Sequence, residues 1–180
     1  MEEFNLENLD TSKVMDMSGM FQGCKNLRSI NLKGKFKTDN VQNMNSMFKE
    51  CSSLIDLDLS NIVTSSVNNM SYLFDSCSSL SNLVIDNLDT KNVIDMSNMF
   101  KGCSNLSEIN LNTFNTEKVI NMSSMFEDCT NIDSISLNEF NTKNVEDMSS
   151  MFCHCTSLTS IIMNKIDTSK FGGEFASKLS

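Results

Sequence analysis

Threonine recurs through the chain at an almost constant spacing, and this spacing constrains the fold more than any other feature. The recurring residues are Thr11, Thr38, Thr64, Thr90, Thr116, Thr142 and Thr168, separated by one step of 27 residues and five of 26. Such a period is typical of solenoids, in which each repeat is one supersecondary unit that can bury its apolar residues only against its neighbours. The sequence therefore predicts a stack of coils.

Within one coil the apolar residues follow a fixed line. From Leu83 it runs through Ile85, Leu88, Val93, Met96, Met99, Phe100, Cys103 and Leu106. Apolar and acidic residues alternate from Asp56 to Leu59, which predicts a strand with one buried side. Phe100 and Cys103 lie three residues apart behind Ser97, a spacing typical of a short helix whose first turn is capped by serine.

We therefore predict an α/β solenoid with one short strand and one short helix in each of about six coils. Residues 1–180 are expected to form a single repeat domain, with regular repeats over about residues 6–168. The line fails at Phe171, where other coils have valine, and Gly172 and Gly173 follow. Residues 169–180 are therefore expected to form a divergent C-terminal cap or tail.

Charge and composition narrow the possible partners. The chain has 14 Lys and Arg against 23 Asp and Glu, which gives a net charge of −9. Nucleic-acid backbones and anionic membrane surfaces attract clustered Lys and Arg, so we expect neither as a partner. The apolar runs are short, and the N-terminal residues lack the basic and apolar regions of a signal peptide, so we expect no membrane insertion by this chain.

Cysteine and methionine also keep fixed positions in the repeat. Six of the seven cysteines lie three residues after a phenylalanine, namely Cys24, Cys51, Cys77, Cys103, Cys129 and Cys155. A residue type kept at one position is most simply a core column, and parallel stacked side chains disfavour disulfide geometry, so we expect reduced thiols. Methionine is interpreted as a flexible core filler. The threonines are expected to satisfy backbone groups of the loops.

The line of residues resembles a known family. The segment Leu54-x-x-Leu57-x-Leu59 matches the strand consensus of leucine-rich repeats, but Ile62 and Thr64 follow where that consensus has Asn or Cys and then Leu. The full line is similar to the 26-residue repeats of BspA-like leucine-rich-repeat surface proteins, through Phe114-Asn115-Thr116, Val119, Met122-Ser123-Ser124-Met125-Phe126, Cys129 and Ile135. The resemblance covers roughly residues 6–168.

This resemblance implies a cell-surface or extracellular protein, in some members a lipoprotein, that binds protein partners in adhesion, host or matrix proteins among them. The family offers no active site to transfer to this chain. Reduced thiols and the missing signal peptide instead favour an intracellular interaction scaffold in the cytoplasm. A passive structural spacer is the third reading.

The motif Cys153-His154-Cys155 contains the only histidine and raises the question of a metal site. Structural zinc ligands are usually separated by two to four residues and number four, and Cys155 already belongs to the cysteine column. We therefore expect no metal and no cofactor, with Cys153 and His154 as exposed helix residues. The carboxylates occupy variable outward positions rather than one pocket, so no enzymatic activity is expected.

The concave strand surface is where solenoids usually bind. Its outward positions form the candidate binding face: Asp56, Asp58, Asn82, Val84, Glu108, Asn110, Ser134, Ser136 and Ile162. These residues are mostly small, polar and mildly acidic, which is compatible with a basic or carbohydrate-rich partner. They lack the Tyr, Trp and Arg that dominate binding hot spots, and they do not indicate an oligomeric state.

Overall fold

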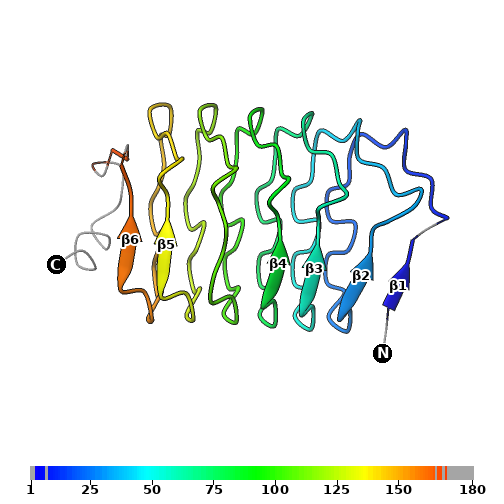
Figure 1. The fold of residues 1–180 in the computed structure, drawn as a ribbon, viewed down its shortest axis with the longest axis horizontal. Coiled ribbons are helices and arrows are strands. Elements are labelled where there is room, and N and C mark those ends of the chain that lie inside the picture. Colours follow the sequence, from blue (N-terminus) through cyan, green and yellow to red (C-terminus); the bar gives the residue numbers. More distant parts are fainter. Residues whose placement is uncertain (1–2, 7, 165, 168, 170–180) are drawn as a thin grey trace.

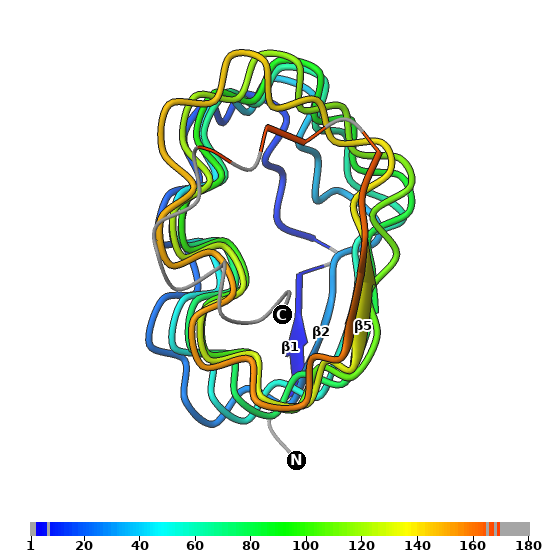
Figure 2. The same cartoon turned by 90° about the vertical axis from the view of Figure 1, so that its left-hand side faces the viewer.

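The computed structural model describes residues 3–6, 8–164, 166–167 and 169, whose coils stack into one elongated solenoid (Figure 1). Three-residue strands each occur in a different coil: β1 (Glu3–Asn5), β2 (Ser29–Asn31), β3 (Asp56–Asp58), β4 (Asn82–Val84), β5 (Ser134–Ser136) and β6 (Ser160–Ile162). Viewed along the stack, the coils largely superpose and the strands share one side (Figure 2). The predicted solenoid of strands is confirmed.

The strands pair in parallel between consecutive coils. β1 pairs with β2, β3 with β4 and β5 with β6. Leu57 lies opposite Leu83, one repeat further along the chain. In β3 the central Leu57 is buried while Asp56 and Asp58 are exposed, so the alternation in the sequence correctly predicted this strand and its buried side.

A second column of parallel backbone bridges ties the coils together elsewhere. This bridge column joins Asp16, Asn43, Asn69, Asp95, Asn121 and Asp147, each to the next. Each of these side chains accepts a hydrogen bond from the backbone N–H two residues later, as Asp95 does from Ser97 at 2.8 Å. Asn and Asp form such local turns readily, which explains why the column contains only these two residue types.

The core consists of side-chain columns that run along the stack. One column stacks phenylalanine rings with centroids 5.3–5.9 Å apart, from Phe21 through Phe48, Phe74, Phe100, Phe126 and Phe152. Beside it, the thiols of Cys51, Cys77, Cys103, Cys129 and Cys155 each donate to the carbonyl of a phenylalanine in the preceding coil, as Cys103 does to Phe74 at 3.2 Å. The predicted core column of cysteines is confirmed from Cys51 to Cys155.

The threonine column joins each coil to the next. Thr90 Oγ1 accepts a hydrogen bond from the N–H of Asn115 at 2.7 Å and donates one to the carbonyl of the same residue at 2.9 Å. The same pair of bonds occurs at Thr11, Thr38, Thr64 and Thr116. The threonines therefore satisfy backbone groups as expected, and the groups belong to the following coil.

The predicted helix in each coil is wrong. Residues 97–102 form successive turns, and no α-helix occurs in the described part of the chain. Alternate N–H groups bond in two directions: Phe100 donates to Met125 of the next coil at 2.9 Å, whereas Cys103 donates to Phe100 three residues back. Asn98 and Gly102 have φ of 57° and 69°, which a right-handed helix excludes.

The physical reason is competition for the backbone donors. A helix would keep every N–H within its own segment, whereas here every second N–H binds the neighbouring coil. No helix follows Ser97, so this serine caps none; its N–H instead donates to the side chain of Asp95. A spacing of three between Phe100 and Cys103 suits these turns as well as it suits a helix.

The two irregular parts of the repeat have different outcomes. The extra residue of the longer repeat falls near Gly34, whose φ of 77° is readily adopted only by glycine. The C-terminal cap or tail predicted over residues 169–180 lies outside the described residues, apart from Ser169.

Candidate functional site

The candidate binding face lies on the surface of the strand side. All nine predicted residues are exposed except Ser136, which is half-buried. Register places Asp56 beside Asn82, Asp58 beside Val84, and Ser136 beside Ile162. Val84 and Ile162 are large apolar residues that expose 41% and 52% of their surface, so the face is less uniformly polar than its composition indicates.

The strand column is interrupted in the middle of this face. Glu108 and Asn110 occupy the expected positions, but residues 108–110 form no strand, so the prediction of one strand per coil fails here. The side chain of Asn110 donates to Asp86 at 2.8 Å, two residues out of the 26-residue register. One coil earlier, Asn82 bonds Asp56 in register, and β3 and β4 pair. The side-chain hydrogen bond between coils is thus in register where the strands pair and out of register where strand pairing is lost.

A groove of about 530 Å³ opens at the interruption. Its lining includes Asn82 and Val84 of β4, Asp86, Glu108, Asn110 and Asn112. Ligand pockets usually measure about 300–1,000 Å³, so the groove is large enough for several residues of an extended peptide. The sequence identified four of these six residues. It missed Asp86 and Asn112, although each lies two residues after the last predicted outward position of its coil and the two are one repeat of 26 residues apart.

The backbone of the interrupted segment remains available for hydrogen bonding. Within the described chain, no group accepts a hydrogen bond from the N–H of Glu108, Ile109 or Asn110. Ile109 is half-buried, whereas Glu108 and Asn110 are exposed. Unpaired strand-like backbone is the feature that extended peptides recognise when they add to a sheet edge.

Acidic groups dominate the charge of this face. Asp56, Asp58, Asp86 and Glu108 are exposed carboxylates. Hydrogen bonds from the side chain and backbone of Ser60 hold the pKa of Asp58 below its ordinary value. The face therefore stays negatively charged at neutral pH.

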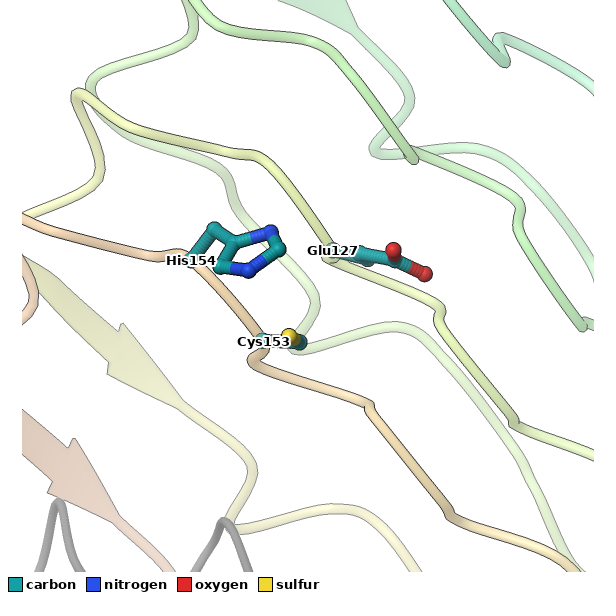
Figure 3. Close-up of side chains that lie close together, drawn as sticks. All are labelled: Glu127, Cys153 and His154. Carbon is teal, nitrogen blue, oxygen red and sulfur yellow. The ribbon is translucent and has the colours of Figure 1, made fainter.

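A second cluster lies on the turns, away from the candidate binding face. Glu127, Cys153 and His154 come from two neighbouring coils, and their side chains lie close together (Figure 3). One ligand atom of each lies within 4.8 Å of the other two. Residues 153 and 154 lie on a turn rather than on the predicted helix; His154 is exposed as expected, Cys153 is half-buried, and Cys155 belongs to the buried column.

Charged neighbours surround this cluster. Lys101 Nζ lies 2.9 Å from Oε2 of Glu127, and Asp128 Oδ1 lies 2.9 Å from Nδ1 of His154. Burial acts to raise the pKa of Glu127, but hydrogen bonds from Ser124 and Lys101 outweigh it and leave this pKa below its ordinary value. The sequence did contain a signal for the cluster, because residues 127 and 128 precede 153 and 154 by one repeat.

The described residues contain no helix of the length and apolar character that crossing a membrane requires. This finding concerns the described residues alone.

Comparisons with known proteins place the sequence and the fold. The model of a family described as "Mycoplasma protein of unknown function, DUF285" matches residues 1–84 and 80–175. No curated protein matches the chain.

Solved structures give the architecture. The crystal structure of a leucine-rich repeat protein from T. pallidum is similar over 94% of this chain and 72% of that one, with a TM-score of 0.61 and 19% sequence identity. At this identity the likeness shows the fold alone. A leucine-rich repeat protein from Bacteroides ovatus aligns over 90% of this chain and 69% of that one at 16% identity, with a TM-score of only 0.22.

Proposed function

The chain belongs to the family described as Mycoplasma protein of unknown function, DUF285, and we propose that its solenoid is a non-enzymatic protein-binding module. Its binding surface is the strand side, centred on the groove at residues 108–110. The partner presents an extended segment with basic side chains. Adhesion to host or matrix proteins is the role that such binding serves.

The interruption of the strand column is the observation that carries this proposal. It combines unpaired backbone donors on Glu108 and Asn110 with the exposed carboxylates of Asp86 and Glu108 and the exposed apolar side chain of Val84. Backbone pairing would provide affinity, and the carboxylates would select basic residues and speed encounter. The leucine-rich-repeat fold supports a role in interaction, because solenoids offer extended surfaces for partners.

A binding experiment with matched charge changes tests the groove. The probe is a fluorescent peptide library with Lys or Arg at alternate positions, compared with acidic peptides of equal length. Glu108→Lys and Glu117→Lys change the net charge equally, and both residues are exposed, but only Glu108 lines the groove. We expect Glu108→Lys to weaken binding by about tenfold or more and Glu117→Lys by about twofold or less.

Equal effects of the two substitutions would mean that binding follows overall charge, and the groove proposal would then be wrong. Binding of the acidic peptides with the same affinity as the basic ones would contradict the proposed partner chemistry.

A cell-surface location is proposed from the resemblance of the repeat line to BspA-like surface proteins. Protease treatment of intact producing cells, followed by mass spectrometry, tests it. Release of peptides from this chain without release of cytosolic proteins is the expected result. Complete protection alongside the cytosolic controls would favour the intracellular scaffold. Absence of any peptide binding, whatever the location, would favour the structural spacer.

A further inference from the structure

We propose that Glu127, Cys153 and His154 form a binding site for one Zn²⁺ ion on the turns of the last two regular coils. The carboxylate, thiolate and imidazole would be the three protein ligands, and water would complete the coordination. This inference is independent of the proposed peptide groove, from which it differs in position, residues and ligand.

The repeat itself brings the three ligands together. Neighbouring coils stack with residues about 26 apart side by side, so Glu127 lies beside Cys153 and Asp128 beside His154. The backbone N–H of Asp128 donates to the carbonyl of Cys153 at 2.9 Å, which joins the two coils at this point. The ligand atoms within 4.8 Å of one another therefore come from a fixed backbone, and small side-chain rotations would close them on an ion.

The sequence argument against a metal considered only adjacent residues. In Cys153-His154-Cys155, the third residue turns inward, where its thiol donates to Phe126 at 3.0 Å. Glu127 of the preceding coil replaces it as the third candidate ligand. The set therefore spans two coils, and only Cys153 and His154 within it are adjacent in the sequence.

The donor types select the ion. Zn²⁺ binds Cys sulfur, His nitrogen and carboxylate oxygen, and sites with three protein ligands keep one position for water. Mg²⁺ and Ca²⁺ prefer sites made only of oxygen donors, so a thiolate and an imidazole disfavour them. The mixed set of Glu127, Cys153 and His154 fits zinc best among the common divalent ions.

Neighbouring groups support this assignment. Asp128 binds Nδ1 of His154 at 2.9 Å, so in this proposal the ring ligates through Nε2. A carboxylate that holds the other nitrogen of a ligating histidine is a common arrangement at zinc sites, where it fixes the orientation of the ring. Lys101 contacts Oε2 of Glu127, so the ion would share this carboxylate with Lys101.

The other thiols of the chain are poor competitors. The cysteines of the core column from Cys51 to Cys129 are completely buried, and their thiols donate to phenylalanine carbonyls. Burial raises the pKa of the Cys51 thiol to about 12, so it stays protonated at neutral pH. Cys24 is half-buried at the other end of the stack, which makes it a matched control for Cys153.

Cobalt provides the direct test, because Co²⁺ occupies zinc sites and reports thiolate ligation by charge-transfer absorption. The full chain, reduced and freed of metal, is titrated with Co²⁺ and then with Zn²⁺. We expect one Co²⁺ per chain with a thiolate band that Zn²⁺ removes. Cys153→Ser should abolish the band, whereas Cys24→Ser should leave it unchanged.

The other two ligands need substitutions that preserve the fold. His154 has φ of 58°, a conformation that asparagine also tolerates, so His154→Asn removes the imidazole without new backbone strain. Glu127→Gln keeps the size of the side chain. Each should weaken Zn²⁺ binding by about tenfold or more while the circular dichroism spectrum stays unchanged.

Three results would overturn the site: no thiolate band at one equivalent of Co²⁺, a band that persists in Cys153→Ser, or equal loss of the band in Cys24→Ser. Zn²⁺ should also raise the melting temperature of the wild-type chain and leave that of Cys153→Ser unchanged, since only the native site binds the ion.

Discussion

The bridge column and the strand column belong to the same coils but differ in continuity. The bridge column runs without a gap from Asp16 to Asp147, whereas the strand column breaks between β2 and β3, which belong to separate sheets, and again at residues 108–110, which form no strand. Every bridge residue is Asn or Asp and forms the same local turn, so side chain and backbone enforce one register. The strand column has no such rule: Asn82 binds in register but Asn110 does not. Register is thus maintained where local side-chain bonds repeat, and it relaxes where they vary.

The largest expected effect comes from a substitution in the phenylalanine column of the core. Phe100 is completely buried between Phe74 and Phe126, with ring centroids 5.5 and 5.4 Å away. Phe100→Ala should lower the free energy of unfolding by about 3 to 5 kcal/mol, because it leaves a cavity in a stacked column. Denaturant titration followed by circular dichroism measures the loss.

The control for this change is Val84→Ala on the strand surface. Val84 is 41% exposed, so its truncation should cost about 0.5 kcal/mol. Losses of similar size for the two variants would show that the regular column does not dominate stability.

Removing one threonine bond pair should have the next largest effect. Thr90→Val keeps the side-chain shape but leaves the N–H and carbonyl of Asn115 without their partner, which should cost about 2 kcal/mol. Thr113→Val changes an exposed threonine of the next coil and should cost about 0.5 kcal/mol or less. Thermal melting of the two variants side by side makes the comparison, and equal melting temperatures would refute the bridging role.

Glycine positions in the turns give a smaller, graded effect. Gly102 has φ of 69°, and a Cβ there would lie 3.3 Å from Cα of Ser76, whereas a Cβ at Gly23 would meet nothing within 4 Å. Gly102→Ala should therefore cost about 1 to 2 kcal/mol, and Gly23→Ala about 1 kcal/mol from backbone conformation alone. Equal denaturation midpoints for the two variants would show that the contact with Ser76 adds no cost.

The smallest effect concerns the strand surface. Asp58→Ala should change stability by about 0.5 kcal/mol, because the side chain is exposed. The pKa of Asp58 is lowered in the folded state by Ser60, so its contribution is present above its unfolded pKa of about 3.9 and is lost as pH falls through the folded pKa. The difference in melting temperature between wild type and variant should shrink from about pH 6 to about pH 3. A difference that grows toward acid would contradict this assignment.

Sequence reasoning succeeded where one residue type repeats at one position. The columns of Phe100, Cys103 and Thr90 were predictable because their spacing fixes both burial and neighbours. The helix was not distinguishable, since a spacing of three fits helix and turn alike. Gly102, with Gly19 and Gly23 at related positions, was the available hint of positive φ.

The candidate sites were predictable only in part. The exposed residues of the strand side followed from alternation, as at Asp56 and Asp58. The groove did not, because Ile109 keeps the apolar line of its coil and nothing in that line marks the lost pairing. The cluster of Glu127, Cys153 and His154 could be found only by comparing residues one repeat apart, because Glu127 and Cys153 are 26 residues apart in the sequence but adjacent in the stack.

The bonds between coils have an evolutionary consequence. Thr90 hydrogen-bonds to Asn115, and Thr64 hydrogen-bonds to Asp89 in the same way. Neighbouring coils are thus joined by equivalent bonds. Recombination that gains or loses 26 codons in frame would rejoin equivalent partners and keep the core columns intact. The length of the array can thus change by whole units while the groove and the turn cluster, each built from neighbouring coils, are inherited or lost as separate modules.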